Sequence, residues 1–93
     1  MMLKIRRSEK FIKNLKRLIN KGVIKISQSE KFLRLLAENP VHPSLRVKKM
    51  QGTNGIFEAS LNMEVRVTFN YVKPDAIYLR NIGKHDITLK SNK

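Results

Sequence analysis

An arginine and a histidine in the second half of the chain are the side chains best suited to chemistry. Arg66 stands in the run Glu64–Tyr71, which alternates polar and apolar residues, and His85 follows Gly83 at the end of another apolar run. A guanidinium can stabilise the charge that builds up on a phosphate during its transfer. An imidazole moves protons near neutral pH, because its unperturbed pKa is about 6.5. In RNA the neighbouring 2′-hydroxyl supplies the nucleophile, so this pair suits the cleavage of RNA without a metal ion.

Basic side chains near these two residues are candidates for phosphate binding. They lie in the predicted strands or just after them: Arg46, Lys48, Lys49, Arg80 and Lys84. Asp86 follows His85 and either orients its imidazole or caps the C-terminal segment. Surface roles stay open as well, since Arg66 can pair with Glu58 or Glu64, and His85 can be an ordinary surface histidine.

The net charge favours a polyanionic partner. The 93 residues hold 20 Lys and Arg against seven Asp and Glu, a net charge of +13. Residues 1–50 carry fourteen basic and three acidic side chains, so most of the excess lies in the first half of the chain. Such an excess is typical of proteins that bind RNA, DNA or the ribosome.

Several classes of protein are disfavoured by what the sequence lacks. Without cysteine it has neither a disulfide framework nor a cysteine metal site, and two histidines with scattered acids predict no metal and no cofactor. It has no glycine-rich phosphate loop and no serine nucleophile motif. No apolar run is as long as a membrane span, and the N-terminus lacks the apolar core of a signal peptide. We expect a cytoplasmic protein that binds no membrane and no small-molecule cofactor.

The N-terminal part predicts a strand followed by an amphipathic helix. Met2–Arg7 alternates apolar and basic residues, as a strand with one buried face does. Ser8 is a favourable N-cap for a helix over Glu9–Lys21, and Gly22 ends it. The helix is expected to bury the apolar residues that recur with helical spacing: Phe11, Ile12, Leu15, Leu18 and Ile19.

A second helix follows, and the sequence leaves two starting points open. Ser27 and Glu30 have the spacing of a capping box, which predicts a start after Ser27. The apolar residues from Val23 onward favour an earlier start. Asn39-Pro40 ends this helix, and its apolar face consists of Phe32, Leu33, Leu35 and Leu36.

The rest of the chain predicts four strands. Leu45–Met50 and Ala76–Ile82 flank a hairpin between Ile56 and Tyr71, whose loop is Asn62, Met63 and Glu64. This loop keeps both apolar sets on one face. The predicted apolar pairs are Leu61 with Val65, Ala59 with Val67, and Phe57 with Phe69, and Tyr71 points to the same core. The predicted polar pairs are Ser60 with Arg66 and Glu58 with Thr68, on a face expected to be exposed.

These elements predict one α+β domain over residues 1–93, in the order β-α-α-β-β-β-β. Two short helices with one apolar side each are expected to form a helical hairpin. That hairpin packs on one face of a small, largely antiparallel sheet.

Five short strings between residues 39 and 86 carry a family resemblance. They are Asn39-Pro40-Val41-His42-Pro43-Ser44-Leu45, Lys48-Lys49-Met50-Gln51-Gly52, Gly55-Ile56-Phe57-Glu58-Ala59, Val65-Arg66-Val67 and Tyr78-Leu79-Arg80-Asn81-Ile82-Gly83-Lys84-His85-Asp86. In their order and spacing the chain resembles the RelE/ParE superfamily of toxins from type II toxin–antitoxin systems, in its RelE/YafQ-like branch. The helical hairpin before them agrees with a RelE-like fold.

The resemblance implies a toxin that is neutralised by a cognate antitoxin encoded in the adjacent gene, which we expect to be acidic. RelE-like members are mRNA interferases: they cleave mRNA on the ribosome without metal and so inhibit translation. This implies an endoribonuclease whose product carries a 2′,3′-cyclic phosphate. ParE-like members inhibit DNA gyrase instead. A ParE-like gyrase inhibitor and a non-catalytic RNA- or ribosome-binding domain remain the alternatives.

The family's functional residues carry over in part. Arg66 matches the strand arginine that RelE toxins place at the scissile phosphate. His85 stands where the RelE branch has an arginine and the YafQ-like branch has a catalytic histidine. The two catalytic lysines of the RelE branch fall at Glu58 and Ser60, and the tyrosine of the RelE tail has no match. The resemblance therefore implies the phosphate contact more firmly than the scheme of proton transfer.

Overall fold

The computed structural model describes residues 2–84. Its elements follow the predicted order, with one short 3₁₀ helix (η1) added. They are β1 (Lys4–Arg7), α1 (Glu9–Asn20), α2 (Ile26–Glu38), η1 (Pro43–Leu45), β2 (Lys48–Lys49), β3 (Phe57–Ser60), β4 (Val65–Val72) and β5 (Ala76–Lys84). The α+β class is confirmed.

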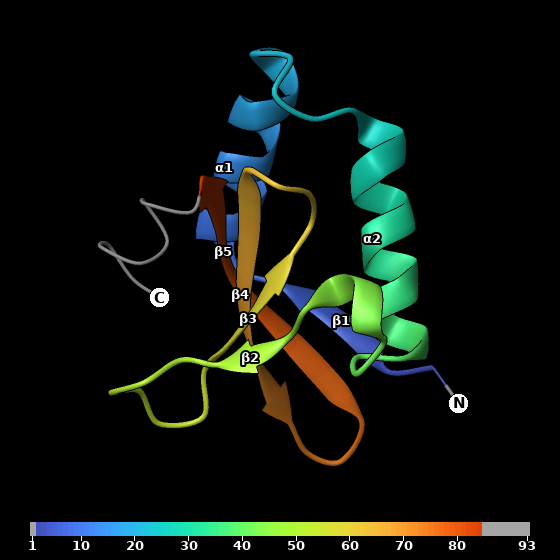
Figure 1. Cartoon of the computed structure of the whole chain (residues 1–93), viewed down its shortest axis with the longest axis vertical. Helices are drawn as coiled ribbons and strands as arrows, with labels where there is room; N and C mark the ends of the chain where they lie inside the picture. Colours follow the sequence, from blue (N-terminus) through green and yellow to red (C-terminus); the bar gives the residue numbers. More distant parts are fainter. Residues whose placement is uncertain (1, 85–93) are drawn as a thin grey trace.

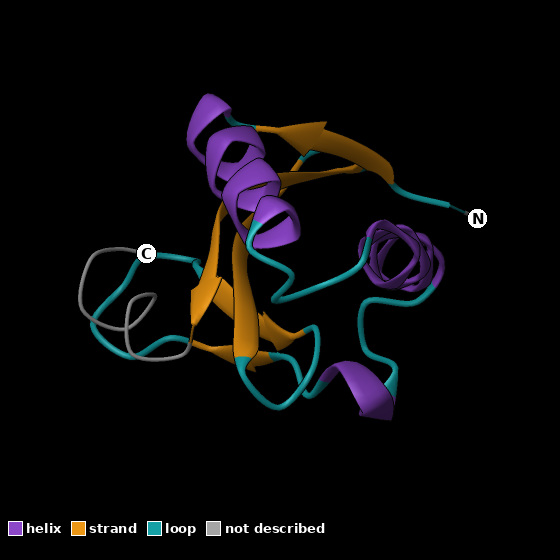
Figure 2. Cartoon of the chain, turned by 90° about the horizontal axis from the view of Figure 1, so that it is seen from above, coloured by secondary structure: helices purple, strands orange, loops and turns teal. Residues whose placement is uncertain are grey.

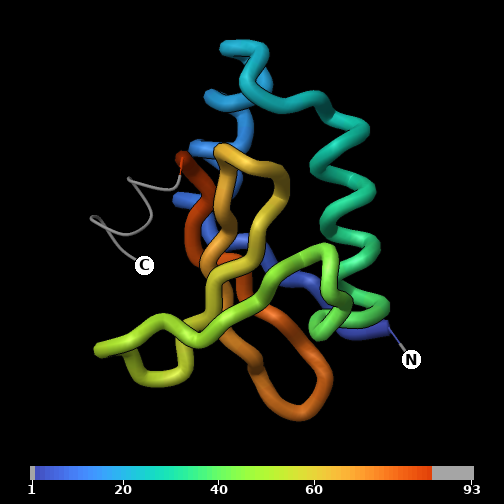
Figure 3. The backbone as a smooth tube through the Cα atoms, viewed as in Figure 1, coloured from blue at the N-terminus to red at the C-terminus, as the bar shows by residue number. Residues whose placement is uncertain are grey.

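The five strands form one mixed sheet in the order β1-β5-β4-β3-β2. The first strand, β1, runs parallel to β5, and all other neighbours are antiparallel. Figures 1 and 3 show β1 beside β5, although the two strands lie near opposite ends of the chain. This topology places β4 and β5 in the centre of the sheet, where neighbours on both sides hold their side chains in position.

The hairpin of β3 and β4 has the predicted register. Phe57 lies opposite Phe69, and Ser60 opposite Arg66. The loop is tight because the Asn62 side-chain oxygen accepts backbone N–H groups of both Glu64, at 2.9 Å, and Val65, at 2.8 Å. An asparagine that bonds its own backbone in this way mimics a turn, so the sequence of the loop sets the pairing that follows.

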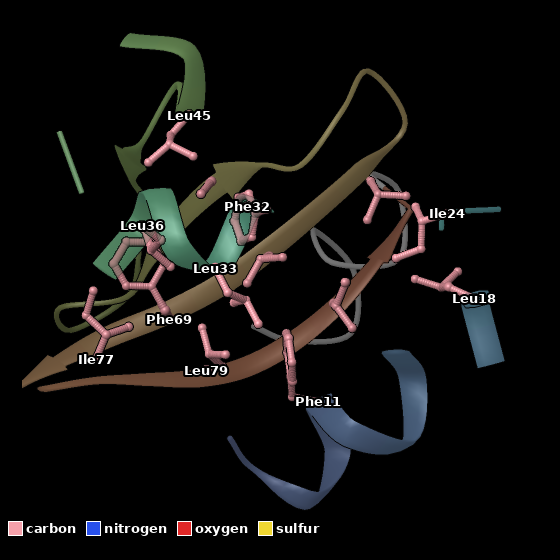
Figure 4. Packing of buried hydrophobic residues seen from close by; sticks show 14 residues of the cluster. Phe11, Leu18, Ile24, Phe32, Leu33, Leu36, Leu45, Phe69, Ile77 and Leu79 are labelled. Atoms are coloured by element: carbon pink, nitrogen blue, oxygen red, sulfur yellow. The ribbon is translucent and has the colours of Figure 1, made fainter. Parts of the chain in front are cut away.

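One apolar core joins both helices to one face of the sheet. Figure 4 shows Phe11 of α1 and Phe32, Leu33 and Leu36 of α2 approaching β4 and β5. The sheet contributes Ala59, Val65, Val67, Phe69, Ile77, Leu79 and Ile82. In Figure 2, α2 is seen end-on and α1 obliquely, so the helices cross while packing on the same sheet. Within residues 2–84 no helix is long and apolar enough to cross a membrane.

Ser8 ties α1 to the last strand. Its hydroxyl oxygen accepts the backbone N–H of Phe11 at 3.0 Å, as predicted for an N-cap. The same hydroxyl donates to the backbone carbonyl of Arg80 at 2.9 Å. The prediction that Ile12 is buried is wrong, since this side chain is 37% exposed. Because α1 packs mainly against β5, at one side of the sheet, Phe11 and Leu18 face the core and Ile12 does not.

The second helix begins at Ile26, between the two predicted starts. Lys25 is its extended N-cap residue, and the Gln28 side-chain oxygen accepts the Lys25 backbone N–H at 2.8 Å. Gln28 thus takes the role predicted for Glu30. A start at Val23 is prevented because the connecting segment buries Ile24 in the core.

The strand predicted from Leu45 to Met50 shrinks to the two residues of β2. Leu45 ends η1 and is buried, and Arg46 then adopts a left-handed conformation with φ 49°. Tyr71 also departs from its predicted burial. It faces the apolar side of β4 but is 43% exposed, because a cavity beside η1 leaves it partly uncovered.

Candidate functional site

Polar side chains from β3, β4 and β5 form a row across the centre of the sheet. Glu58 pairs with Thr68, and Thr68 with Asn81. The prediction that this face is exposed is wrong here, since Glu58 is only 1% exposed and the other two are also buried. Longer side chains from neighbouring elements reach over the row. Lys48 and Arg66 lie against Glu58, and Asn14 of α1 donates to the Asn81 side-chain oxygen at 2.7 Å.

Arg66 lies next to this row with part of its guanidinium already fixed. Nη1 donates to the backbone carbonyls of Asn62, at 2.8 Å, and Met63, at 3.1 Å. Nε lies 4.0 Å from the Glu58 carboxylate. Within residues 2–84, Nη2 donates no hydrogen bond. The loop therefore positions the guanidinium while leaving one of its N–H₂ groups free to bind an anion.

Glu58 carries a buried negative charge between two cations. Its Oε1 lies 3.7 Å from Lys48 Nζ and 4.0 Å from Arg66 Nε, and its Oε2 has no hydrogen-bond partner. A buried carboxylate is costly unless it is paired and hydrogen-bonded. This one is paired by charge, but within residues 2–84 its Oε2 has no hydrogen bond, so a ligand that donates to Oε2 would complete its pairing.

A β-bulge brings Arg80 to the same face. Phe69 pairs with Leu79 while Thr68 pairs with Asn81, so Arg80 is the extra residue in β5. Its Nη1 donates to the Asn70 side-chain oxygen at 3.1 Å, and its Nε is buried without a partner. A bulge re-aims side chains in this way, so Arg80 and Asn81 both reach the polar face.

Sequence reasoning missed the polar partners Asn14, Thr68, Asn70 and Asn81 as parts of the site. A signal for the bulge was present in the apolar spacing of the last strand. Ile77 and Leu79 are two residues apart, but the next core residue is Ile82. This interruption of the two-residue alternation indicates one inserted residue in the strand.

The predicted phosphate-binding residues separate into three places. Arg66, Lys48 and Arg80 share the polar face of the sheet. Arg46 and Lys49 line the cavity beside η1. Lys84 pairs with Val65, on the other side of the pleat from Arg66, and lines a cleft of about 250 Å³ between α1 and the end of β5. His85 and Asp86 lie outside the described residues.

The polar face has the donors to bind a phosphate, and within residues 2–84 it has four buried polar atoms without hydrogen-bond partners. These atoms are Glu58 Oε2, Thr68 Oγ1, Arg80 Nε and Asn81 Nδ2. Buried polar groups are nearly always paired, so their clustering marks this face as a site. Within residues 2–84 no group of three or more His, Cys, Asp or Glu side chains is placed to hold a metal ion.

Comparison with known proteins gives matches in structure only. No family model and no curated protein matches the sequence. A metal-bound toxin from Helicobacter pylori superposes with a TM-score of 0.80 at 26% identity, over 94% of this chain and 99% of that one. Escherichia coli YafQ, solved in a toxin–antitoxin complex with DinJ, gives 0.76 at 16% identity, over 95% and 98%.

A third structure, the Helicobacter pylori protein HP0892, gives a TM-score of 0.71 at 27% identity, over 91% of this chain and 97% of that one. All three matches span nearly the whole of both chains. The chain therefore shares the fold of YafQ and of the Helicobacter pylori toxin over nearly its whole length. The predicted family resemblance and RelE-like fold are thereby confirmed. Arg66 lies on the sheet face opposite the apolar core, the face on which Asn14 of α1 reaches Asn81. The functional role of Arg66 remains a prediction.

Proposed function

We propose that this RelE/YafQ-like toxin is a ribosome-dependent, metal-independent mRNA endoribonuclease that inhibits translation. One observation carries the proposal: Arg66 is held by two loop carbonyls, and its other N–H₂ group has no hydrogen-bond partner within residues 2–84. Lys48 and Arg80 lie on the same face. The net charge of +13 draws the protein to RNA.

Arg66 acts on the scissile phosphate. Because its loop contacts exist before substrate binds, the guanidinium needs little reorganisation when charge develops on the phosphorane-like transition state. Removing such a contact typically costs about 100–1000-fold in rate. The 2′-hydroxyl attacks the adjacent phosphorus, the bond to the 5′-oxygen breaks, and a 2′,3′-cyclic phosphate remains.

His85 is the proposed proton donor to the departing 5′-oxygen. In sequence it comes two residues after Gly83, which pairs with Arg66 across β4 and β5. A histidine suits proton transfer near neutral pH, which is the motive for giving His85 this role. Asp86 is proposed to orient it.

The proposed partner is a cognate, acidic antitoxin encoded in the adjacent gene. Escherichia coli YafQ was solved together with DinJ in a toxin–antitoxin complex. A free protein with this much positive charge gains from an acidic partner that covers its basic surface. Co-expression with the neighbouring reading frame tests this: we expect the two chains to co-purify and the complex to melt above the free toxin.

A second candidate is a non-catalytic RNA- or ribosome-binding domain. The observation that favours it is Glu58, whose buried carboxylate stands where the RelE branch has a lysine and pairs with Arg66. A carboxylate at this position competes with a phosphate for the guanidinium. Such a protein would bind ribosomes without cleaving mRNA.

The discriminating experiment is induction of the toxin in a host, followed by mapping of new mRNA 5′ ends on ribosome-bound and free mRNA. The endoribonuclease predicts new ends on ribosome-bound mRNA within minutes. The non-catalytic domain predicts stalled translation with intact mRNA. Inhibition of purified DNA gyrase without RNA cleavage would replace both with a ParE-like function.

A further inference from the structure

A second feature suited to RNA lies on the other side of the sheet from Arg66. A cavity of about 320 Å³ opens between η1, β2 and the end of β4. Figure 1 shows η1 and β2 along the edge of the sheet. Tyr71 lines the cavity and is an odd number of positions from Arg66 in β4, so the two side chains leave opposite faces. The cavity volume is at the lower end of the range of small-molecule sites, which leaves room for one flat ring system.

Tyr71 offers an aromatic surface that is held in place and partly open. Its ring lies edge-on to Phe57, with ring centres 5.3 Å apart, and to Phe69, with ring centres 5.6 Å apart. The side chain is nevertheless 43% exposed. Burial of the remainder raises the pKa of Tyr71 above 10.0. A phenol is neutral at physiological pH even without this shift, so the ring does not repel an anion.

Cations line the same cavity as this ring, and none of the lining residues within 2–84 is acidic. Arg46, Lys48 and Lys49 all contribute to its wall. Arg46 holds a left-handed conformation, with φ 49°, that favours glycine. As the C-cap residue of η1, Arg46 turns the chain here, and its side chain lines the cavity.

His42 adds a directed donor. Its Nδ1 accepts the backbone N–H of Ser44 at 3.1 Å, and the Ser44 hydroxyl lies 2.8 Å away. A neutral imidazole that accepts at Nδ1 carries its proton on Nε2. Because His42 lines the cavity, this N–H can serve a bound ligand.

We propose that this cavity binds an unpaired nucleobase of RNA together with an adjacent phosphate. The base stacks on Tyr71, His42 donates to the base through Nε2, and Arg46 and Lys49 hold the phosphate. Aromatic rings beside cations are the combination that binds single strands, because every base has a π-face and every nucleotide a charge. The proposal rests on the proposed function only in taking RNA as the ligand, and it does not require cleavage.

The short strand β2 connects this subsite to the Arg66 face. Lys48 lines the cavity and also lies 3.7 Å from Glu58, which belongs to the polar row beside Arg66. An RNA strand can therefore cross the edge at β2, with one nucleotide on Tyr71 and another phosphate near Arg66. The cavity would then hold the RNA at a distance from the scissile bond and set which nucleotide lies at Arg66.

The test compares two probes of equal length and charge on the full chain. One is a short single-stranded 2′-O-methyl RNA, which lacks the nucleophile and cannot be cleaved by the proposed route. The other is its abasic counterpart. Fluorescence anisotropy should show that the wild type prefers the probe with bases by about 5- to 150-fold, as expected for one stacked base.

Two variants separate the base contact from the phosphate contact. Tyr71→Leu should abolish the preference for bases, and Tyr71→Phe should keep it, because the ring remains. Arg46→Gly should weaken the binding of both probes to the same extent. It should also lower, by about 0.7, the slope of log affinity against log salt concentration. Glycine suits the left-handed backbone at this position, so the fold tolerates that change. Lys31→Gln, on the exposed side of α2, is the matched loss of one charge and should have a smaller effect.

The proposal is overturned if Tyr71→Leu keeps the wild-type preference for bases, or if Arg46→Gly binds no more weakly than Lys31→Gln. It is also overturned if these variants leave RNA binding unchanged and loosen only the complex with the antitoxin, because the cavity would then be a protein contact. A wild type that shows the base preference but never cleaves mRNA would refute the proposed nuclease and leave this subsite in place.

Discussion

Replacing Glu58 with glutamine should tighten RNA binding. The side chain keeps its shape, and the site loses a negative charge whose Oε1 lies 4.0 Å from Arg66 Nε. A phosphate that accepts a hydrogen bond from Nη2 of Arg66 places its oxygens roughly 7 Å from that carboxylate, given ordinary hydrogen-bond lengths. Two unit charges at this distance repel by about 0.6–2.4 kcal/mol for effective dielectric constants between 80 and 20. Affinity should therefore rise about 3- to 60-fold.

The fold should tolerate Glu58→Gln. The Lys48 side chain is 64% exposed and can return to water, and Arg66 keeps its bonds to the loop carbonyls. We expect a loss of at most about 1–2 kcal/mol in urea unfolding. Glu64→Gln is the matched control, because it removes the same charge from an exposed position in the nearby loop.

The assay is equilibrium binding of an uncleavable single-stranded RNA at several salt concentrations. Glu58→Gln should bind more tightly than both the wild type and Glu64→Gln, and the difference should shrink as salt screens it. Weaker or unchanged binding would refute the reasoning that Glu58 competes with phosphate. Tighter binding together with a large loss of cleavage would show that the Glu58 carboxylate also takes part in proton transfer.

Three further changes test other contacts. Arg66→Lys keeps the charge but loses the planar group that donates to two loop carbonyls. The cleavage rate should therefore fall about 100–1000-fold, while the free energy of unfolding stays within about 1 kcal/mol of wild type. A cleavage rate near wild type would show that charge alone suffices. Ser8→Ala should cost about 1–2 kcal/mol in urea unfolding, because Ser8 both caps α1 and donates to Arg80, and a cost near zero would contradict this. Burial raises the pKa of Tyr71, so the folded state retains this proton above pH 10 while the unfolded chain loses it. Stability should therefore fall as pH rises past 10, and Tyr71→Phe should fall less steeply than wild type in alkaline unfolding curves; equal slopes would contradict the assignment.

The strand pattern and the position of Arg66 were predictable because period-two alternation leaves little freedom. Pairing Phe57 with Phe69 puts Ser60 opposite Arg66 once both apolar faces share a core. The order of elements followed in the same way. Ser8 was recognisable because a serine before an acidic, amphipathic run has one favourable use.

The environment of Arg66 was not predictable from local pattern. Alternation gives the face on which a side chain lies, but not which other side chains cover it. Glu58 therefore appeared exposed, although Lys48 from the neighbouring strand β2 reaches its carboxylate. The cavity beside η1 was hidden for a similar reason. The sequence predicted a full strand from Leu45, whereas the left-handed turn at Arg46 interrupts it.

The starting point of α2 shows how tertiary packing overrides a local signal. Ser27 and Glu30 match a capping box, yet the helix begins at Ile26, with Gln28 bonding the Lys25 backbone. Burial of Ile24 fixes where the connecting segment meets the core. The energy gained by burying that side chain exceeds the small difference between two alternative caps.

Single-turnover cleavage of ribosome-bound mRNA tests the central claim most directly. Wild-type protein, Arg66→Ala and His85→Ala are compared after thermal melting confirms that all three fold. The account predicts cleavage by the wild type with a 2′,3′-cyclic phosphate product. Arg66→Ala should be about 100–1000-fold slower, and His85→Ala about 100–10,000-fold slower with one limb of the pH–rate profile missing. Wild-type rates in either variant, or intact mRNA with the wild type, would contradict it.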